Sequence, residues 1–307
     1  MNATQSNTLT ALSADLASAV EAAARSVVYV DAHPRRDASG IVWDEHHVVT
    51  VAHAIDREDE IELLLPEGGT TVATLVGGDP STDVALLRTN ATLVPATRST
   101  RADLAVGHLV LAVGRDEDGA TGASFGVISS LDGPWRTWRG GDVDRFIRPD
   151  VNVYPSFSGG PLVDAAAQVL GMNTWGLSRR MALTLPLATL ERVVAALLGG
   201  GRVTRGYLGV AMQAVHLPES LRGAHALQQR DGVIVIDVAA GGPAERGGML
   251  IGDVLLALDG RAVEDSDEVQ RALGTQSVGA SLPVRVLRGG EPRTLTVTIG
   301  ERPHDGR

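Results

Sequence analysis

Ten short runs of aliphatic and β-branched residues follow one another between residues 26 and 188, and turn-forming residues separate each run from the next. The runs are VVYV, GIVW, HHVVTV, EIELLL, TVATLV, DVALLR, HLVLAVG, FGVISS, QVLGM and LTLP. Apolar runs of this length and spacing are typical of strands in a β-sandwich or barrel. The 36 Gly residues, against four Trp, three Tyr and three Phe, agree with many tight turns. The sequence therefore predicts a mainly β fold over this part of the chain.

Helical segments flank these strands on both sides. Near the N-terminus, apolar residues recur at three- and four-residue spacing, at Leu9, Leu12, Leu16, Val20 and Ala23. This spacing predicts an amphipathic helix that packs on the body of the protein. The segment LATLERVVAALL at 187–198 is again helical in its spacing, and the GGG at 199–201 ends it. We therefore expect an N-terminal helix within 1–25, a domain over 26–198 and a linker over 199–205.

A second set of strands follows the linker, with the sequences GYLGVAMQ, GVIVIDV, DVLLALDG, SLPVRVLRG and RTLTVTIG. Two short helices interrupt this set, one at PAERGG and one from about Asp265 to Leu273. A sheet with two helices and about a hundred residues buries a core of its own. Residues 206–302 are therefore expected to form a second domain.

Charge and composition exclude several classes of protein. The formal net charge of −10 disfavours nucleic acid as a partner, because a phosphate backbone needs a cationic surface. The chain has no Cys, which excludes disulfides, thiol nucleophiles and Cys-ligated zinc. No run reaches the ~18 apolar residues of a membrane span, and the N-terminus lacks the pattern of an export signal. We expect a cytoplasmic protein if Met1 is the native start, and a periplasmic or otherwise extracytoplasmic one if an export segment was removed.

Three residues have contexts that suit nucleophilic catalysis. Ser158 precedes two glycines and a proline in FSGGPLVD, His53 follows an apolar strand in VVTVAHAI, and Asp83 precedes another in DPSTDVALLR. Each residue alone is also compatible with an ordinary turn or a structural hydrogen bond. Together they provide a hydroxyl nucleophile, a base and a carboxylate that holds the base, in the order His, Asp, Ser.

The segments around these residues carry a family resemblance. TVAHA around His53, STDVALL around Asp83 and YPSFSGGPLV around Ser158 resemble the trypsin-like proteases of the HtrA (Deg) group. The resemblance extends to ASGIV at 38–42, LAVGR at 111–115, FGVISS at 125–130 and LGMNT at 170–174. It implies a chymotrypsin-like fold of two six-stranded β-barrels, with the triad in the cleft between them and no cofactor.

The resemblance also assigns the oxyanion hole to the backbone N–H groups of Ser156 and Ser158, and here the chain departs from the family pattern. The family usually has Gly two residues before the nucleophile, where this chain has Ser156. A Ser held at positive φ carries strain of order 1 kcal/mol or more. We therefore expect a hole that is flipped, or that assembles only when peptide binds.

By the same resemblance, Asn152, Val153, Thr174 and Trp175 line the pocket for the residue before the cut bond. Asn152 and Val153 carry no formal charge, so the pocket suits a small or medium apolar side chain. Trp175 either narrows this pocket or belongs to the core. The segment LDGPWRTWRGGDVDR at 131–145 resembles the sensor loop of the family, and its Trp135 and Trp138 either serve that role or fold back onto the barrel.

Residues 204–302 resemble a PDZ domain of the kind appended to HtrA proteases, in RGYLGV, in GVIVIDVAAGGPAERGGMLIGDVLLALDGRAV and in VRVLRGGEPRTLTVTI. Such a domain receives a peptide C-terminus on backbone N–H groups and adds the peptide to a strand edge. The residues expected to bind it are Tyr207, Leu208, Gly209 and Val210 in the loop and strand, and Val269 and Leu273 on the second helix. Val269 and Leu273 are equally compatible with core positions, and Arg205 is either a water-mediated carboxylate partner or simply exposed.

Two hypotheses on function follow. The first is an HtrA-like serine endopeptidase that cleaves unfolded or tagged proteins, with a PDZ domain that binds C-terminal peptides. The second is a catalytically impaired pseudo-protease that serves as a peptide-binding adaptor. The resemblance also implies a homotrimer, although residues 1–28 contain no aromatic residue that would lock one. A metal site at His46 and His47 is not expected, because adjacent strand residues point to opposite faces.

Overall fold

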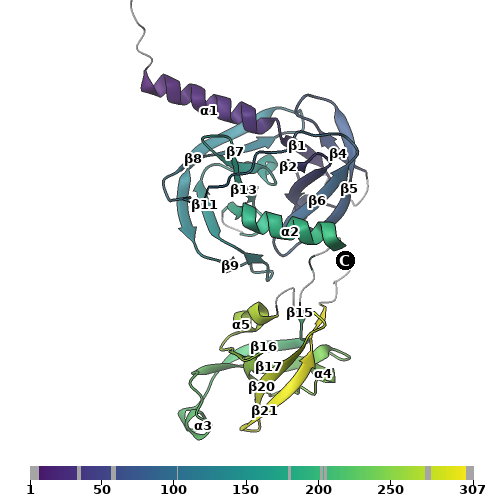
Figure 1. Cartoon of the computed structure of the whole chain (residues 1–307), viewed down its shortest axis with the longest axis vertical. Helices are drawn as coiled ribbons and strands as arrows, with labels where there is room; N and C mark the ends of the chain where they lie inside the picture. The colour runs from purple at the N-terminus through teal and green to yellow at the C-terminus, as the bar shows by residue number, and fades with distance from the viewer. Residues whose placement is uncertain are drawn as a thin grey trace, which may run out of the picture. The chain divides into compact units, whose positions relative to one another are not determined.

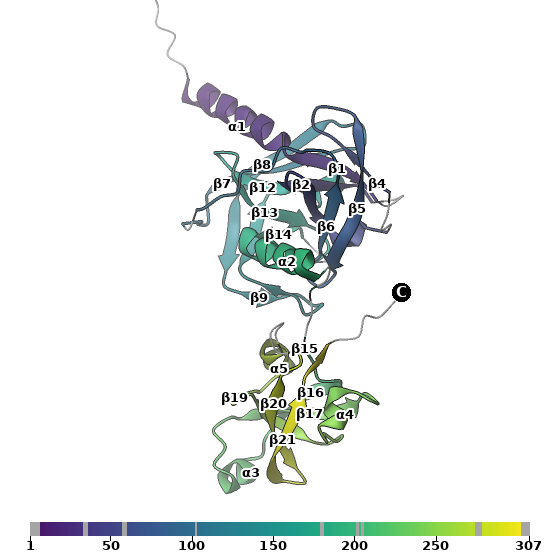
Figure 2. The same ribbon diagram turned by 45° about the vertical axis from the view of Figure 1, so that its right-hand side comes forward.

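The computed structural model describes residues 7–32, 36–56, 60–101, 103–178, 181–200, 203, 206–273 and 278–301. The chain divides into two compact units, Met1–Val203 and Thr204–Arg307, so the division falls within the segment expected to be a linker. Arg205, which the sequence offered as a carboxylate partner, lies outside the described residues. Figures 1 and 2 show that the first unit consists mostly of strands, with one helix near each end of its sequence.

The first unit begins with a closed barrel in the strand order β1-β2-β3-β6-β5-β4. Its strands are β1 (Val27–Asp31), β2 (Ala38–Asp44), β3 (His47–Val51), β4 (Ile61–Leu64), β5 (Thr70–Asp79) and β6 (Val84–Thr89). A 3₁₀ turn, η1 (Ala52–Ala54), follows β3. Antiparallel pairing of β1 with β4 closes the barrel.

A second closed barrel follows in the order β11-β14-β13-β12-β7-β8. Its strands are β7 (Leu109–Arg115), β8 (Thr121–Asp132), β11 (Phe146–Asp150), β12 (Pro161–Asp164), β13 (Val169–Thr174) and β14 (Leu183–Pro186). The hairpin of β9 (Trp135–Arg136) and β10 (Asp142–Val143) extends from β8, and the 3₁₀ turn η2 (Pro155–Phe157) precedes β12. The expected pair of six-stranded barrels is confirmed.

Strand β11 was not among the ten runs that the sequence singled out. Its sequence, FIRPD, contains Pro149, and a proline interrupts the hydrogen-bond ladder of a sheet. The structure accommodates this proline at an irregularity, because the register of β11 against β8 shifts between Arg148 and Pro149. Strand β11 is therefore identified by its pairing with β8 and β14 rather than by its own sequence.

The two helices of the first unit differ in how they pack. Helix α2 (Leu187–Gly200) buries Leu190, Val193 and Leu197 and continues two residues past the expected end. Helix α1 (Thr8–Ala24) buries only Ala19, Ala23 and Ala24, near its C-terminal end. Leu16, Val20 and Ala23 pack on the core of the first unit as expected, whereas Leu9 is 71% exposed and Leu12 39%, so the expected packing holds only for the C-terminal part of the helix. Figure 1 shows the N-terminal half of α1 projecting from the barrels.

The second unit contains a sheet in the order β16-β17-β18-β20-β21, with β19 paired to β18, and a two-stranded sheet of β15 and β22. The strands are β15 (Gly206–Tyr207), β16 (Val210–His216), β17 (Asp231–Val238), β18 (Val254–Leu258), β19 (Arg261–Ala262), β20 (Ser281–Arg288), β21 (Glu291–Thr298) and β22 (Gly300–Glu301). Helices α4 (Pro243–Arg246) and α5 (Ser266–Ala272) match the two expected helices. A further helix, α3 (Glu219–Ala224), was not expected, because it buries no residue and so has no apolar periodicity.

Candidate active site

His53 and Asp83 meet because of the register of two strands in the first barrel. Val51, the last residue of β3, pairs with Val84, the first residue of β6. The turn η1 that follows β3 therefore lies beside the residue that precedes β6, and the Ala52 N–H donates to the Asp83 carbonyl at 3.1 Å. Residues 30 positions apart in the sequence thus come into contact at one end of the barrel.

The Asp83 carboxylate fixes His53 at two points. The His53 ring Nδ1 lies 2.8 Å from Oδ2 and 3.0 Å from Oδ1, and the His53 backbone N–H donates to Oδ1 at 2.9 Å. Asp83 is 1% exposed, and its φ of 62° lies in the left-handed region that Asp tolerates better than most residues. A carboxylate on Nδ1 leaves Nε2 as the ring atom available for proton transfer.

Thr174 completes the environment of this carboxylate. Its hydroxyl donates to Asp83 Oδ2 and accepts from the Gly176 N–H at 2.8 Å. A Cβ on Gly176 would lie 2.2 Å from Asp83 Oδ2 and 2.8 Å from His53 Nδ1, so only glycine fits against the pair. Sequence reasoning did not identify Gly176, because a glycine after a strand has no local pattern that would indicate such a contact.

Ser158 lies on the segment between η2 and β12 and is 2% exposed. It lines a cavity of about 430 Å³ together with His53, and the other lining residues are Arg36, Asp37, Val153, Pro155 and Trp175. Its Oγ accepts a long hydrogen bond from the Trp175 N–H at 3.4 Å. Within the part of the chain that the structure describes, no hydrogen bond joins this Oγ to His53. The serine and the base share one cavity, with the serine hydroxyl turned toward Trp175.

The backbone around Ser156 has a closed conformation. The Ser158 N–H donates to the Pro155 carbonyl at 3.2 Å, and the Phe157 N–H donates to Tyr154 O at 2.9 Å. Ser156 lies inside the 3₁₀ turn η2 and is not one of the described non-glycine residues with positive φ. The strain expected for Ser156 is therefore absent here. The Pro155 carbonyl oxygen occupies the Ser158 N–H, which is one of the two expected oxyanion donors.

Ser39, from the hairpin of β1 and β2, holds this closed loop in place. Its hydroxyl donates to Ser156 O at 2.6 Å, and its backbone N–H donates to Ser158 O at 2.9 Å. Gly159, at φ +88°, passes so close that a Cβ would lie 2.1 Å from Ser39 O. The sequence placed Ser39 only within a family motif, ASGIV, and gave it no role.

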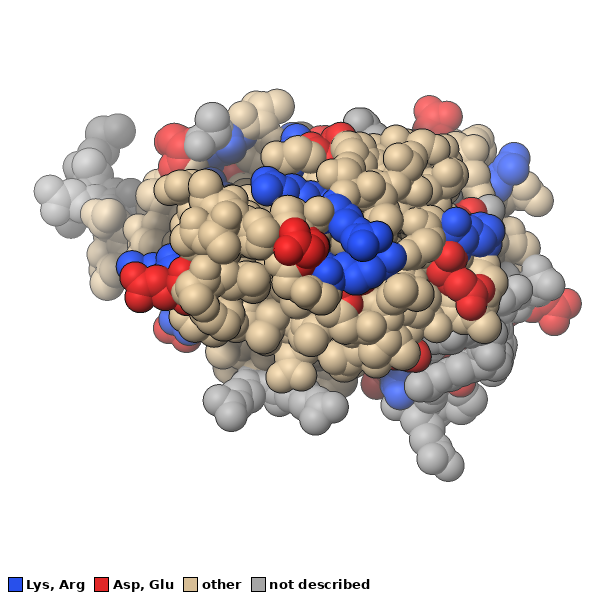
Figure 3. All heavy atoms as spheres, turned by 90° about the horizontal axis from the view of Figure 1, so that it is seen from below, with Lys and Arg blue, Asp and Glu red and all other residues tan. Residues whose placement is uncertain are grey.

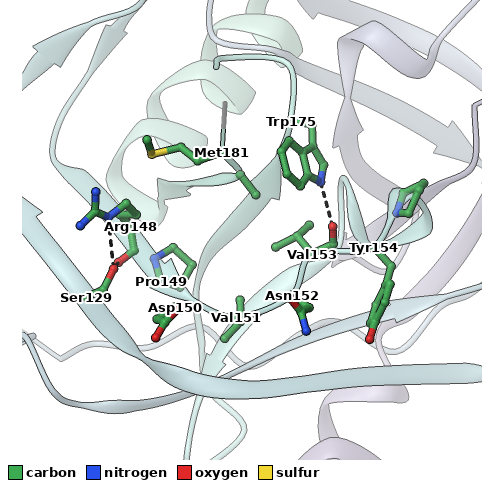
Figure 4. A pocket seen from close by; sticks show the side chains of 12 residues that line it. Ser129, Arg148, Pro149, Asp150, Val151, Asn152, Val153, Tyr154, Trp175 and Met181 are labelled. Carbon is green, nitrogen blue, oxygen red and sulfur yellow. Dashed lines mark hydrogen bonds between the residues drawn. The ribbon is translucent and has the colours of Figure 1, made fainter. Parts of the chain in front are cut away.

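The residues expected to form a specificity pocket separate in the structure. Asn152, Val153 and Trp175 line a second cavity of about 700 Å³, whereas Thr174 is fully buried and faces Asp83. The Thr174 side chain lines neither this cavity nor the one that contains Ser158, so its place in the specificity pocket stays a prediction. Figure 4 shows the cavity, which is also lined by Ser129, Arg148, Pro149, Asp150, Val151, Tyr154, Pro155, Met181 and Ala182. Two of these, Arg148 and Asp150, add charge that Asn152 and Val153 did not suggest.

The hairpin of β9 and β10 rests on the loop that carries Asp83. The Thr137 hydroxyl donates to Ser81 O at 2.6 Å, and Arg139 Nη1 donates to Pro80 O at 3.3 Å. Trp135 is half-buried and contacts Phe146 edge-on, with ring centroids 5.7 Å apart, while Trp138 is 66% exposed. One Trp of the 131–145 segment thus folds back onto the barrel and the other does not.

In the second unit, the expected peptide loop leaves backbone donors available. Leu208 O and Gly209 O accept hydrogen bonds from Ala244 and Ala239, but the N–H groups of Leu208 and Gly209 have no acceptor among the described residues. Gly209 has a φ of +80°, which suits glycine. Tyr207 pairs with Gly300 in the sheet of β15 and β22.

The neighbouring strand β16, which begins at Val210, pairs with β17 and leaves its other edge without a strand in the described sheet. Val269 is 0% exposed and Leu273 3%, and both belong to the core cluster that includes Leu208. Both helix residues are therefore buried in the core of the second unit, and their role beside a peptide groove stays a prediction.

The remaining candidates have separate partners. His47 Nδ1 contacts Asp44 at 2.8 Å, and His46 Nδ1 lies 3.2 Å from Ala91 O. No group of three or more His, Asp or Glu suited to a metal occurs in the described ranges.

Among the helices that the structure describes, none has the length and apolarity to cross a bilayer. Figure 3 shows one face on which a short band of Arg lies beside acidic groups, with most of the surface uncharged.

Comparison with known proteins gives two domain matches. Residues 38–172 match the trypsin-like peptidase domain, and residues 206–299 match the PDZ domain. A protein of Halomonas elongata named "probable periplasmic serine endoprotease DegP-like" is 34% identical over 269 residues, which cover 86% of this chain and 56% of that protein. A similarly named protein of Ectopseudomonas mendocina is 32% identical, covering 87% and 56%. The chain thus spans little more than half the length of these relatives.

Solved structures match over more of their length. The HtrA-type protease AlgW with a tripeptide is 30% identical, with a TM-score of 0.75, and the match covers 94% of this chain and 97% of that one. AlgW with a decapeptide gives 28% identity and a TM-score of 0.77, covering 94% and 99%. The two barrels, the domain matches and these likenesses agree, and the chain belongs to the HtrA/Deg group of trypsin-like serine proteases that carry a PDZ domain.

Proposed function

We propose that the chain is a serine endopeptidase that acts through His53, Asp83 and Ser158. The observation that carries the proposal is the double hold of Asp83 on His53, in a cavity that also contains Ser158. Two hydrogen bonds to ring and backbone fix the imidazole orientation, which is the role of the carboxylate in triad catalysis. The DegP-like relatives, which are named serine endoproteases, support the same activity.

The reaction uses these three residues in turn. Ser158 Oγ attacks the carbonyl carbon of the scissile peptide bond and passes its proton to His53 Nε2. Asp83, on Nδ1, stabilises the imidazolium that forms. His53 then gives the proton to the leaving amine, and water hydrolyses the acyl-enzyme with His53 as base. For the first step, the Ser158 hydroxyl turns from the Trp175 N–H toward His53.

The resting conformation lacks one oxyanion donor, because the Ser158 N–H is occupied by Pro155 O. Loss of one such donor costs roughly 100- to 1000-fold in rate. We propose that substrate or an activating peptide turns the peptide bond between Pro155 and Ser156. This turn moves Pro155 O off the Ser158 N–H and brings the Ser156 N–H to face the cavity. This closed loop is also the observation that favours the second candidate function, a pseudo-protease that binds peptides without cleaving them.

The second unit is proposed to bind peptide C-termini. The unoccupied N–H groups of Leu208 and Gly209 suit a carboxylate, and the edge of β16 suits an added strand. The peptide complexes of AlgW support this role. Gly209→Ala is expected to weaken binding roughly fivefold, because φ +80° costs a residue with a Cβ about 1 kcal/mol. Fluorescence anisotropy with labelled C-terminal peptides measures the change, and Gly223→Ala, in open space on α3, is the matched control.

Coupling between peptide and cleavage is proposed to pass through the 131–145 segment. Its contacts with Pro80 and Ser81 support this, because they lie on the loop that carries Asp83. Replacing Trp135 and Trp138 together is expected to remove peptide-stimulated cleavage and spare basal cleavage. Equal loss of both would show that the two Trp residues only stabilise the fold.

Substrates, location and assembly are also proposals. Unfolded or tagged proteins are the proposed substrates, and degradation of a casein-like unfolded protein tests this. The relatives are named periplasmic proteases, which supports a periplasmic location, and cell fractionation tests it. The exposed Leu9 and Leu12 of α1 support self-assembly, for which the homotrimer is the proposed form. A monomer mass in solution would remove the trimer.

The experiment that separates protease from pseudo-protease is reaction of the full chain with a fluorophosphonate probe, with and without C-terminal peptides, beside Ser158→Ala. Labelling that requires Ser158 is the expected result. Absence of labelling under every condition, while peptides still bind, would replace the endopeptidase with the adaptor.

A further inference from the structure

Trp175 lies between the two cavities beside the nucleophile. The cavity of about 430 Å³ contains His53 and Ser158, and the one of about 700 Å³ contains neither. Both are lined by Val153, Pro155 and Trp175, so these residues form the wall that the cavities share. Figure 4 shows the Trp175 indole beside Val153 at the edge of the larger cavity, with Met181 across from it.

The backbone of Trp175 is held on both sides. Thr174, before it, donates its hydroxyl to Asp83, and the Gly176 N–H, after it, donates to the same hydroxyl. Gly176 also packs against Asp83 and His53 with no room for a Cβ. The backbone here therefore moves only if the His53–Asp83 pair moves with it.

The indole is held by much less. Its Nε1–H donates to the Val153 carbonyl at 2.9 Å, and the residue is 42% exposed. One hydrogen bond and a partly solvated ring permit rotation about the side-chain torsions while the backbone stays fixed. In the wall between the cavities, the Trp175 indole is therefore the part that can rotate. Val153, at 6% exposed, is the part that stays in place.

We propose that Trp175 determines which substrate side chains the enzyme accepts before the cut bond. With the indole on Val153 O, the cavity beside Ser158 stays separate from the larger one, so a long side chain does not reach the larger cavity. Rotation of the indole breaks this hydrogen bond and joins the two cavities, so that a long apolar side chain such as Leu or Phe reaches the space lined by Pro149, Val151 and Met181. The inference rests on the proposed endopeptidase function and adds its selectivity.

Two variants separate the hydrogen bond from the bulk of the ring. Trp175→Phe keeps an aromatic ring but cannot donate to Val153 O, and Trp175→Ala removes both. The full-length variants are compared with wild type using peptide chloromethyl ketones that carry Ala, Leu or Phe before the reactive carbon. Phe125→Leu, at an exposed aromatic residue outside both cavities, is the control.

Loss of one hydrogen bond is expected to raise the Leu and Phe inactivation rates of Trp175→Phe roughly three- to tenfold. Trp175→Ala is expected to raise the ratio of the Phe rate to the Ala rate at least tenfold over wild type. An unchanged ratio in Trp175→Ala, or a uniform fall for all three probes in both variants, would overturn the proposal.

A binding measurement keeps the test independent of catalysis. In a Ser158→Ala background labelled with 5-fluorotryptophan, the ¹⁹F resonance of Trp175 is assigned from its absence in the Trp175→Phe variant. Saturating peptides ending in Phe are expected to shift this resonance, and peptides ending in Ala to leave it in place. Identical behaviour with both peptides would overturn the selectivity role even if the chain labels with fluorophosphonate. Failure of labelling alone would affect only the proposed function.

Discussion

The backbone N–H of Ser158 donates to the carbonyl oxygen of Pro155 at 3.2 Å, which closes a 3₁₀ turn over the position where an oxyanion would bind. Ser39 supports this turn from a different barrel, through its hydroxyl on Ser156 O. Ser158 and His53 therefore share one cavity without a hydrogen bond between them, and the Ser158 N–H that was expected to bind an oxyanion is occupied by Pro155 O.

Ser156→Gly is expected to increase activity. Turning the Ser156 N–H inward requires positive φ, which costs a non-glycine residue of order 1 kcal/mol or more and glycine very little. We expect the second-order rate of fluorophosphonate labelling to rise roughly fivefold or more. Ser156→Ala, which keeps the Cβ, should remain at the wild-type rate. A rise in both variants would point to the hydroxyl rather than the backbone.

Gly176→Ala is expected to reduce cleavage about 100-fold, because a misplacement of about 1 Å at a catalytic group has effects of that size. The added Cβ would lie 2.2 Å from Asp83 Oδ2, so the His53–Asp83 pair must shift. Peptide hydrolysis kinetics measure the change, with Gly199→Ala, in open space on α2, as control. Near-normal activity in Gly176→Ala would mean that the pair tolerates displacement.

Thr137→Val is expected to lower kcat about tenfold with little change in KM. The substitution leaves Ser81 O and the Gly141 N–H without their hydroxyl partner, at about 1–3 kcal/mol for each buried group. The loop that carries Asp83 then loses one support. Steady-state kinetics of Thr137→Val and Thr137→Ser check this, since Thr137→Ser retains the hydroxyl and should restore kcat. Equal loss in both would contradict a positioning role.

Asp253 gives the second unit a pH-dependent stability. Burial by itself raises the pKa of Asp253, but the hydrogen bonds from Arg288 and from the Leu250 N–H outweigh it, and the net pKa lies below the ordinary value. A carboxyl with a depressed folded-state pKa stabilises the fold above its unfolded pKa of about 3.9 and loses this contribution as pH falls through the folded pKa.

Asp253→Asn is therefore expected to destabilise the second unit by about 3 kcal/mol at pH 7, the size of a broken buried pair. Asp253 is 1% exposed and Arg288 26%, so little solvent screens the interaction. Hydrogen exchange of β17 and β18 in the full chain measures the effect, which should shrink as the pH falls below about 4. Asp237→Asn, at an exposed carboxylate on β17, serves as control. A difference that persists unchanged in acid would exclude the ionised pair as its cause.

The sequence by itself predicted a mainly β fold and the candidates His53, Asp83 and Ser158, because each depends on a short segment, and the resemblance to the HtrA group added the pair of barrels. His53 at a strand end, Asp83 in a turn and Ser158 before two glycines each occupy a local structure that favours particular residue types, so the sequence pattern reveals them. It also indicated that the position of Ser156 conflicts with an open oxyanion hole. The alternation within β11 was obscured by Pro149, whose bulge exists only against β8.

Only the tertiary structure decided how these parts contact one another. The Thr137 hydroxyl contacts Ser81, which lies 56 positions earlier in the sequence. Gly176 packs against His53 and Asp83, which also lie much earlier in the sequence. The Thr174 hydroxyl faces Asp83, and Val269 is buried in the core of the second unit. These outcomes depend on which side chains converge when separate strands pair, and that geometry is a property of the packed barrels and sheets rather than of any local segment.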